Sequence, residues 1–150
     1  MSVEATTQKE LKGIGGWLTF LAIGLPLNII MTILFNYNIF TNIIPMLEDE
    51  MVSILTILLM TDMILVCYVG YLAFLFFNKD YRFPKQMKIF YIVNIAYSLF
   101  ASVLFISSGY SLESSDYSDL FSKIIIAAIW IPYFNKSIRV RNTFIEKNQV

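Results

Sequence analysis

The sequence contains no histidine and a single cysteine, Cys67, among its 150 residues. Histidine is the commonest general base and a frequent metal ligand, so its absence excludes serine–histidine triads and the usual zinc sites. One cysteine cannot form a disulfide within the chain. These absences leave no set of residues suited to catalysis, and we expect a protein that is not an enzyme and that holds no metal or cofactor.

Charge is also scarce. Charged residues make up 15% of the chain and hydrophobic residues 57%, whereas a soluble domain carries about 25% charge. Lys plus Arg and Asp plus Glu number 11 each, which excludes the strongly basic surface of a protein that binds nucleic acid. Much of the surface is therefore expected to face lipid, and the bilayer is the first partner that the composition indicates.

Four long apolar segments cover about residues 16–36, 51–77, 89–109 and 119–135. A membrane-spanning helix needs about 20 mainly apolar residues. The first three segments satisfy this directly, and the fourth does so if Lys123 extends its amine to an interface. Unpaired backbone groups are not tolerated in lipid, and the alternation of barrel strands is absent. The sequence predicts an all-α integral membrane protein, with one four-transmembrane-helix bundle over residues 1–150.

The basic residues are distributed unequally along the chain. Ten of the 11 lie before the first apolar segment, in the loop between the second and third segments, or after the fourth. The other two loops, between the first and second segments and between the third and fourth, are acidic. Such a distribution places the basic loops in the cytoplasm. We therefore expect an N-in/C-in topology with both termini cytoplasmic. The tail over residues 136–150 is expected to extend the fourth helix and then to lie along the membrane interface.

Asp62 is a carboxylate within the second segment, about 16 Å from its outer end and therefore near the middle of the bilayer. Asn28 and Ser98 fall at a similar depth, and Asn94 lies on the same small, polar stripe as Ser98. We predict an intramembrane polar cluster of these four residues. Because no Lys or Arg is expected to reach Asp62, its carboxyl is expected to be neutral and hydrogen-bonded to an Asn or Ser side chain.

Two interpretations of this cluster remain open. It is either a hydrogen-bonded clamp between helices, or a relay or binding site for a proton, cation or polar ligand. A single carboxylate without a second acid or an internal repeat favours the clamp.

Aromatic and basic residues mark the cytoplasmic rim. Trp17 begins the first segment, and Trp130 and Tyr133 end the fourth, so all three are expected to be interface anchors on the same side. Several polar and basic residues fall at the depth of lipid headgroups and are predicted either to contact an anionic phospholipid or a partner, or to serve only as the topology signal. These are Lys85, Lys88, Ser137, Arg139 and Arg141.

Two end motifs carry a family resemblance. The motifs are GIGGWL over residues 13–18 and IWIPYF over residues 129–134, the latter followed by S-x-R-V-x-x-T-F over residues 137–144. Together they resemble the bacterial "domain of unknown function 2569" family of small four-helix inner-membrane proteins. The resemblance implies a multi-pass protein of the bacterial cytoplasmic membrane, and it implies no reaction, cofactor or catalytic residue.

Two functions are compatible with these features. Stripes of small residues favour a non-enzymatic component that assembles with or regulates another membrane protein, or that forms a homo-oligomer. The alternative is a carrier for a small molecule, lipid or proton that uses the Asp62 cluster.

Overall fold

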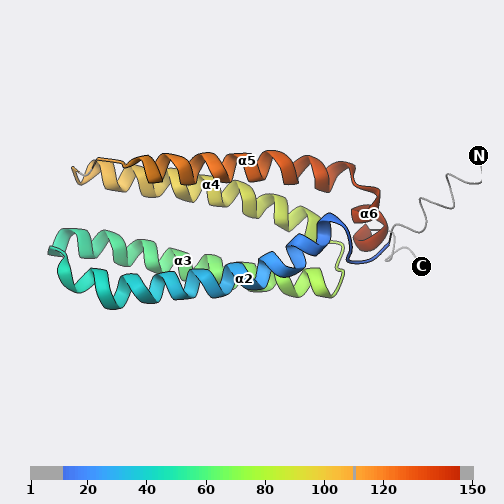
Figure 1. Cartoon of the computed structure of the whole chain (residues 1–150), viewed down its shortest axis with the longest axis horizontal. Helices are drawn as coiled ribbons and strands as arrows, with labels where there is room; N and C mark the ends of the chain where they lie inside the picture. The colour runs from blue at the N-terminus through green and yellow to red at the C-terminus, as the bar shows by residue number, and fades with distance from the viewer. Residues whose placement is uncertain (1–11, 110, 146–150) are drawn as a thin grey trace, which may run out of the picture.

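The regular structure of the chain is helical (Figure 1). The computed structural model describes residues 12–109 and 111–145, except for the side chain of Glu50; Lys9 and Lys147, which entered the topology prediction, lie outside these residues. The all-α prediction is confirmed. The helices are α2 (Trp17–Asn38), α3 (Asp49–Phe77), α4 (Phe83–Ser107), α5 (Ser114–Lys136) and α6 (Ile138–Val140), with π-helical turns at Ile39–Ile43 and Arg141–Ile145 and a 3₁₀ turn at Ile44–Met46.

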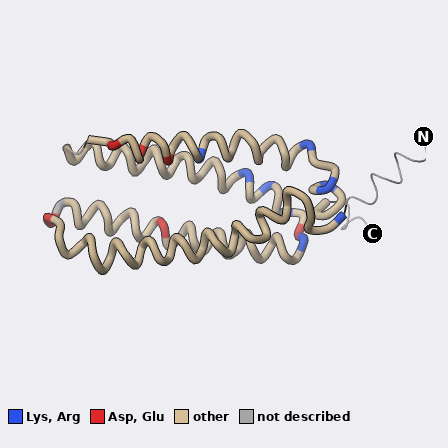
Figure 2. Tube along the Cα trace, in the orientation of Figure 1, with Lys and Arg blue, Asp and Glu red and all other residues tan. Residues whose placement is uncertain are grey.

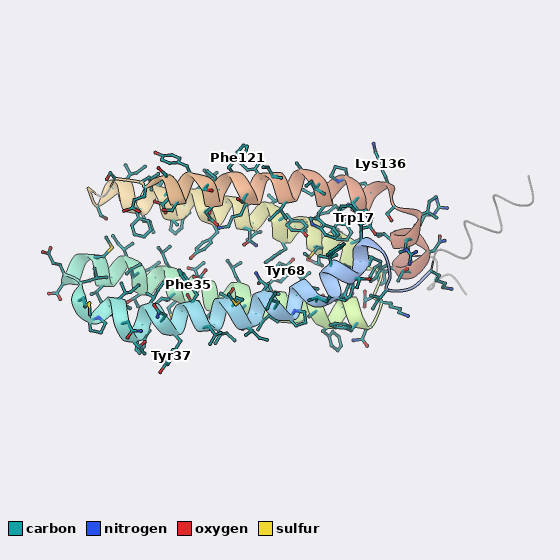
Figure 3. All side chains as sticks on the ribbon, in the orientation of Figure 1. Trp17, Phe35, Tyr37, Tyr68, Phe121 and Lys136 are labelled. Atoms are coloured by element: carbon teal, nitrogen blue, oxygen red, sulfur yellow. The ribbon has the colours of Figure 1, made fainter. Side chains whose placement is uncertain are left out.

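Three helical stretches among the described residues are long and apolar enough to cross a membrane. They are Trp17–Met46, Met51–Phe77 and Phe83–Ser107, of 30, 27 and 25 residues. Large apolar side chains on the outside of the bundle, such as Phe121, are exposed and point away from the other helices (Figure 3). An apolar surface of this extent is suited to contact with lipid.

Three helices, α3, α4 and α5, begin earlier than hydropathy predicts. α4 begins at Phe83 instead of near residue 89, and its first turn holds Pro84, whose fixed φ favours a helix start. α5 begins at Ser114 instead of near residue 119, because Glu113 and Asp116 form a capping box in which the Glu113 N–H donates to Asp116 Oδ2 at 2.9 Å. Hydropathy predicts only the apolar part of a helix, so the polar first turns of α4 and α5 were not included in the predicted segments.

The four long helices form two antiparallel hairpins, α2–α3 and α4–α5, which approach each other at the end that carries the termini (Figure 1). Two hydrogen bonds join α4 to α3: the Tyr68 hydroxyl donates to Gln86 Oε1 at 2.8 Å, and the Tyr97 hydroxyl donates to the Leu58 carbonyl at 3.1 Å. α2 and α5 meet where α2 begins, with the rings of Trp17 and Trp130 6.1 Å apart, and are less closely packed along the rest of their lengths. The hairpins are therefore joined along α3 and α4 and are separated along most of α2 and α5.

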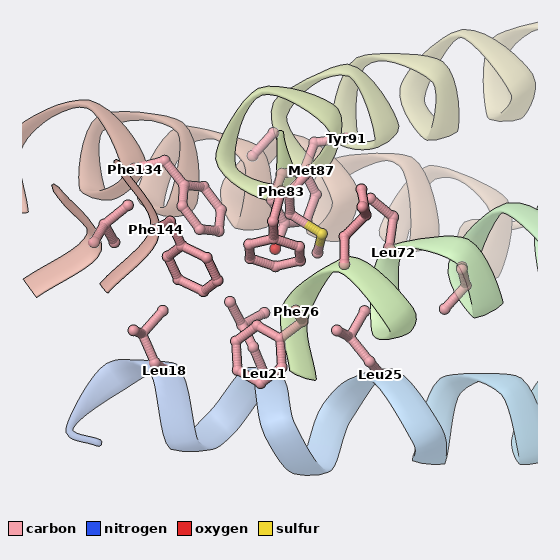
Figure 4. Close-up of a cluster of buried hydrophobic side chains, with 14 residues drawn as sticks. Leu18, Leu21, Leu25, Leu72, Phe76, Phe83, Met87, Tyr91, Phe134 and Phe144 are labelled. Atoms are coloured by element: carbon pink, nitrogen blue, oxygen red, sulfur yellow. The ribbon is translucent and has the colours of Figure 1, made fainter. Parts of the chain in front are cut away.

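An aromatic core joins the hairpins at the end that carries the termini (Figure 4). The Phe83 ring stacks on Phe144 with centroids 5.0 Å apart, and it meets Phe76 edge-on at 5.0 Å. All three side chains are fully buried. Burial of one such ring stabilises the fold by about 1.5–3 kcal/mol. This core, which we call the junction core, also includes Leu18 of α2 and Phe134 of α5.

The C-terminal segment differs from the predicted tail. α5 ends at Lys136, Ser137 adopts an extended conformation, and the chain then turns back. Val140, Thr143 and Phe144 are buried in or beside the junction core. The expectation that this segment extends the fourth helix is wrong, because the chain turns back and its apolar side chains pack against the helix ends. Its position relative to the membrane interface remains a prediction. Residues 146–150 of the predicted tail lie outside the described residues.

Candidate functional site

The two end motifs are in direct contact. The Gly13 N–H donates to Thr143 Oγ1 at 2.9 Å, and the Thr143 hydroxyl approaches the Gly13 carbonyl at 3.4 Å. The Arg139 guanidinium lies against Gly15, where a Cβ atom would be 2.5 Å from Arg139 Nη1. Gly16 has φ of 56°, a conformation that favours glycine. The end motifs therefore hold the N-terminus of α2 to the C-terminal segment.

The predicted interface anchors form one aromatic cluster. The ring of Trp130 lies 6.1 Å from that of Trp17 and 5.4 Å from that of Tyr133, centroid to centroid. The prediction that the three residues lie at the same end is confirmed. With Lys136 they line a hollow of about 300 Å³ on the surface.

The residues predicted to contact lipid headgroups have varied surroundings. Ser137 Oγ accepts from the Val140 N–H at 3.4 Å and so caps α6, and Arg139 packs on the glycines of the first motif. Lys88 Nζ donates to Asn135 Oδ1 at 2.7 Å. Lys85 and Arg141 are exposed. Ser137, Arg139 and Lys88 thus contribute to the fold, and the contact of all five residues with lipid remains a prediction.

The structure brings all four members of the predicted polar cluster together. Asn28, Asp62, Asn94 and Ser98 line one cavity of about 560 Å³ between the hairpins. A second cavity of about 450 Å³ adjoins it and shares both asparagines. We call the two cavities together the cleft. It lies where α2 and α5 are separated.

Asp62 lies close to the middle of α3. It is 13 residues from the first residue of the helix and 15 from the last, which correspond to about 20 Å and 22 Å at the rise of an α-helix. The predicted depth therefore agrees with the length of the observed helix.

An ion pair faces the cleft from α5. Lys123 Nζ lies 2.6 Å from Asp119 Oδ2 and donates to Ser98 Oγ at 2.8 Å. The Ser98 hydroxyl donates to Asp119 Oδ2 at 3.0 Å. Ser98 is on α4, so this polar triad links the two helices of one hairpin, and all three residues line the same cavity as Asp62.

Among the described residues no cation forms an ion pair with Asp62, as predicted, but one cation lies nearby. Lys123 lines the same cavity, and its charge acts on the Asp62 carboxyl. The Lys123 amine is bonded to Asp119 and Ser98, and its extension to a membrane interface remains a prediction. Lys123 lies nine residues inside α5, about 14 Å from the helix start, whereas the carboxylate of Asp119 is one turn away on the same face.

Sequence reasoning missed three further residues around Asp62. The Tyr97 hydroxyl and the Asn36 amide approach its carboxyl from α4 and α2, and Asp119 lines the same cavity. Asn36 is 6% exposed, and its amide nitrogen and oxygen have no hydrogen-bond partner. Two signals could have found these residues. Asn36 continues the four-residue spacing from Asn28, and Asp119 precedes Lys123 by four.

Helices of spanning length, an apolar outer surface and a polar cleft between hairpins together define an α-helical multi-pass membrane protein. A family model described as "Protein of unknown function (DUF2569)" matches residues 11–145. The chain belongs to this family, and the resemblance predicted from the end motifs is confirmed. No curated protein and no solved structure matches the chain significantly.

Proposed function

We propose that the chain spans the bacterial cytoplasmic membrane four times, with both termini in the cytoplasm, and that α5 is the fourth span. α5 has 23 residues and is therefore about 34 Å long, which exceeds the roughly 30 Å of a hydrocarbon core. Asp119 and Lys123 line the cleft, which leaves apolar residues such as Phe121 for lipid. Apart from Lys123, the described basic residues gather at the end where α2 begins and α5 ends (Figure 2), in agreement with a cytoplasmic position of that end.

We further propose that the protein is a carrier or binding protein that takes up a small polar or amphiphilic molecule in the cleft and performs no chemistry on it. The observation behind this proposal is the position of charged and amide side chains around a cavity of about 560 Å³. Helix clamps bring polar groups into contact with one another, whereas these groups leave a space the size of a ligand site. The separation of α2 from α5 offers a lateral route for a molecule dissolved in the bilayer.

The interaction or assembly role that the sequence favoured becomes the less supported of the two functions. It was based on grooves of small residues and on the basic cytoplasmic rim. Several of the small and polar residues, Asn28, Asn94, Ser98 and Ala101, line the cleft between the hairpins, where they leave space for a ligand.

The proposal is tested by thiol labelling in intact membranes. In a Cys67→Ser background, Asn94→Cys places a thiol in the cleft, and Phe121→Cys places one on the apolar outside. N-ethylmaleimide reacts with the thiolate, which forms only where water is present. We therefore expect labelling of Asn94→Cys to be at least about tenfold faster. Equal, slow labelling of both variants would mean that the cleft is dry and packed, and would contradict the proposal.

A further inference from the structure

This inference rests on the proposed binding function and concerns the charge of the ligand. The cleft contains two carboxylates, Asp62 and Asp119, and one amine, Lys123. The amine is 2.6 Å from Asp119 and is also bonded to Ser98. Its charge is therefore largely compensated within α5, and Asp62 on the opposite hairpin lacks a cation in contact with it. When all three groups are ionised, the cleft carries one net negative charge.

A buried amide next to Asp62 points in the same direction. Asn36 is 6% exposed and approaches the Asp62 carboxyl from α2, as the Tyr97 hydroxyl does from α4. Both of these groups are neutral, so neither supplies a counter-ion to a carboxylate. The part of the cleft around Asp62 is thus unsatisfied in charge.

The adjoining cavity has a different chemistry. It is lined by aromatic rings of three helices, including Phe20, Phe90 and Trp130. It shares the asparagines Asn28 and Asn94 and the ion pair Asp119–Lys123 with the cavity around Asp62. The faces of aromatic rings attract organic cations and pack well against apolar bodies. A molecule that occupied both cavities would therefore need a positive charge and an apolar body.

We propose that the cleft takes a monovalent organic cation with an apolar body, such as a quaternary ammonium or phosphonium, and that Asp62 exchanges a proton for it. In the empty cleft the Asp62 carboxyl is protonated, because an uncompensated carboxylate in a bilayer is costly. When the cation enters, the O–H bond breaks, the proton passes to water at the mouth of the cleft, and the carboxylate becomes the counter-ion. One positive charge replaces another, so the net charge of the cleft is unchanged.

The other groups that face Asp62 do not compete for this role. From α4 the Tyr97 hydroxyl donates to the Leu58 carbonyl and is a weak acid. From α5 Asp119 and Lys123 neutralise each other. α2 contributes the amides of Asn28 and Asn36, which do not titrate. The proton that leaves on binding is therefore assigned to Asp62.

The test uses two probes of the same shape and opposite charge, tetraphenylphosphonium and tetraphenylborate, with the full chain purified in detergent. Calorimetry in buffers of different ionisation enthalpy measures affinity and proton release. We expect the phosphonium to bind with release of about one proton and to bind more weakly as the pH falls.

The Asp62→Asn variant should bind the phosphonium at least ~30-fold more weakly, because the positive charge of the bound cation then has no counter-ion in the cleft. The pH dependence of binding should disappear in the same variant. Asp49→Asn, at the end of the same helix and away from the cleft, should behave as the unaltered protein.

The outcomes separate this inference from the proposed function. Equal binding of both probes, or binding without proton release, would overturn the cation exchange, while protection of Asn94→Cys from N-ethylmaleimide by either probe would retain a ligand-binding cleft. If neither probe binds and neither protects Asn94→Cys from N-ethylmaleimide, the cation exchange and the proposed binding function are both overturned. If Asp62→Asn does not fold, the proton release and pH dependence of the unaltered protein decide the question.

Discussion

At the scale of single residues, Thr143 connects the two end motifs of the family through both polar groups of Gly13. It is 1% exposed, so its removal leaves backbone groups without a partner. We expect Thr143→Val to lower the free energy of unfolding by about 1–2 kcal/mol, measured by thermal unfolding in detergent. Thr56→Val is the matched control, because the Thr56 hydroxyl is exposed and bonds only to the Val52 carbonyl of its own helix. Equal effects of the two substitutions would show that the Thr143 contact does not stabilise the junction.

The loop between α3 and α4 contains a second residue whose behaviour can be predicted. Asp80 accepts hydrogen bonds from the backbone N–H, Nε and Nη2 of Arg82, at 2.8, 3.0 and 2.9 Å. These bonds hold the pKa of Asp80 below its ordinary 3.8. A depressed pKa contributes stability that is present above the unfolded value and is lost as the pH falls through the folded value. That loss therefore begins near pH 3.8 and is completed below it.

We expect Arg82→Gln to raise the pKa of Asp80 toward 3.8, as followed by NMR of the carboxyl carbon during an acid titration. Lys85→Gln removes a cation that is not bonded to Asp80 and should leave the pKa almost unchanged. Both side chains of the pair are in contact with water, so the effect on stability is small and the pKa is the more sensitive readout. An unshifted titration in the Arg82 variant would show that the pair does not persist in solution.

At the scale of elements, the short C-terminal segment determines how the hairpins are held together. α6 and the following turn contribute Val140 and Phe144 to a core otherwise made by the ends of α2, α3, α4 and α5. The segment lies beyond the last predicted spanning helix, but its side chains are among the most buried in the described chain. It therefore stabilises the bundle as a fifth packing element.

This role predicts a large cost for Phe144→Ala. The ring is fully buried and lies 5.0 Å from Phe83 and 5.9 Å from Phe76, centroid to centroid. Its removal should lower the free energy of unfolding by about 3–5 kcal/mol through lost burial and a cavity. Phe121→Ala, at an exposed position on α5, should cost far less in detergent. A small effect of Phe144→Ala would mean that the hairpins are held together without the C-terminal segment.

At the scale of the whole molecule, the charges at the two ends of the bundle differ in sign (Figure 2). Described basic residues such as Arg82 and Arg139 belong to the end that carries the termini, and acidic residues such as Asp49 and Asp116 belong to the other. A bilayer sorts such ends by the positive-inside rule.

The proposed topology therefore predicts that a reporter fused after Val150 is active in the cytoplasm. It also predicts that Leu47→Cys, in a Cys67→Ser background, reacts with a maleimide that cannot cross the membrane. Asn78→Cys should react only after the membrane is permeabilised. Labelling of both positions from the same side would rule out α3 as a complete span, and a periplasmic reporter would rule out a cytoplasmic C-terminus.

The sequence by itself determined which residues form helices and how deep each residue lies. Long apolar segments indicate spanning helices, and the constant rise along a helix sets depth, so Asp62, Asn28 and Ser98 could be assigned to a similar level before any contact was known. The end motifs were sufficient to identify the family.

Only the tertiary structure decided how the helices are rotated and which of them separate. Residue spacing places Lys123 on α5. The direction of its amine is set by the hydrogen bond to Ser98 of α4 and by the cavity between the hairpins that both residues line. The burial of Phe144 likewise depends on Phe83, which is 61 positions away in the sequence. Such contacts join distant parts of the chain, and a local pattern of residue types does not encode them because each helix can bury more than one face.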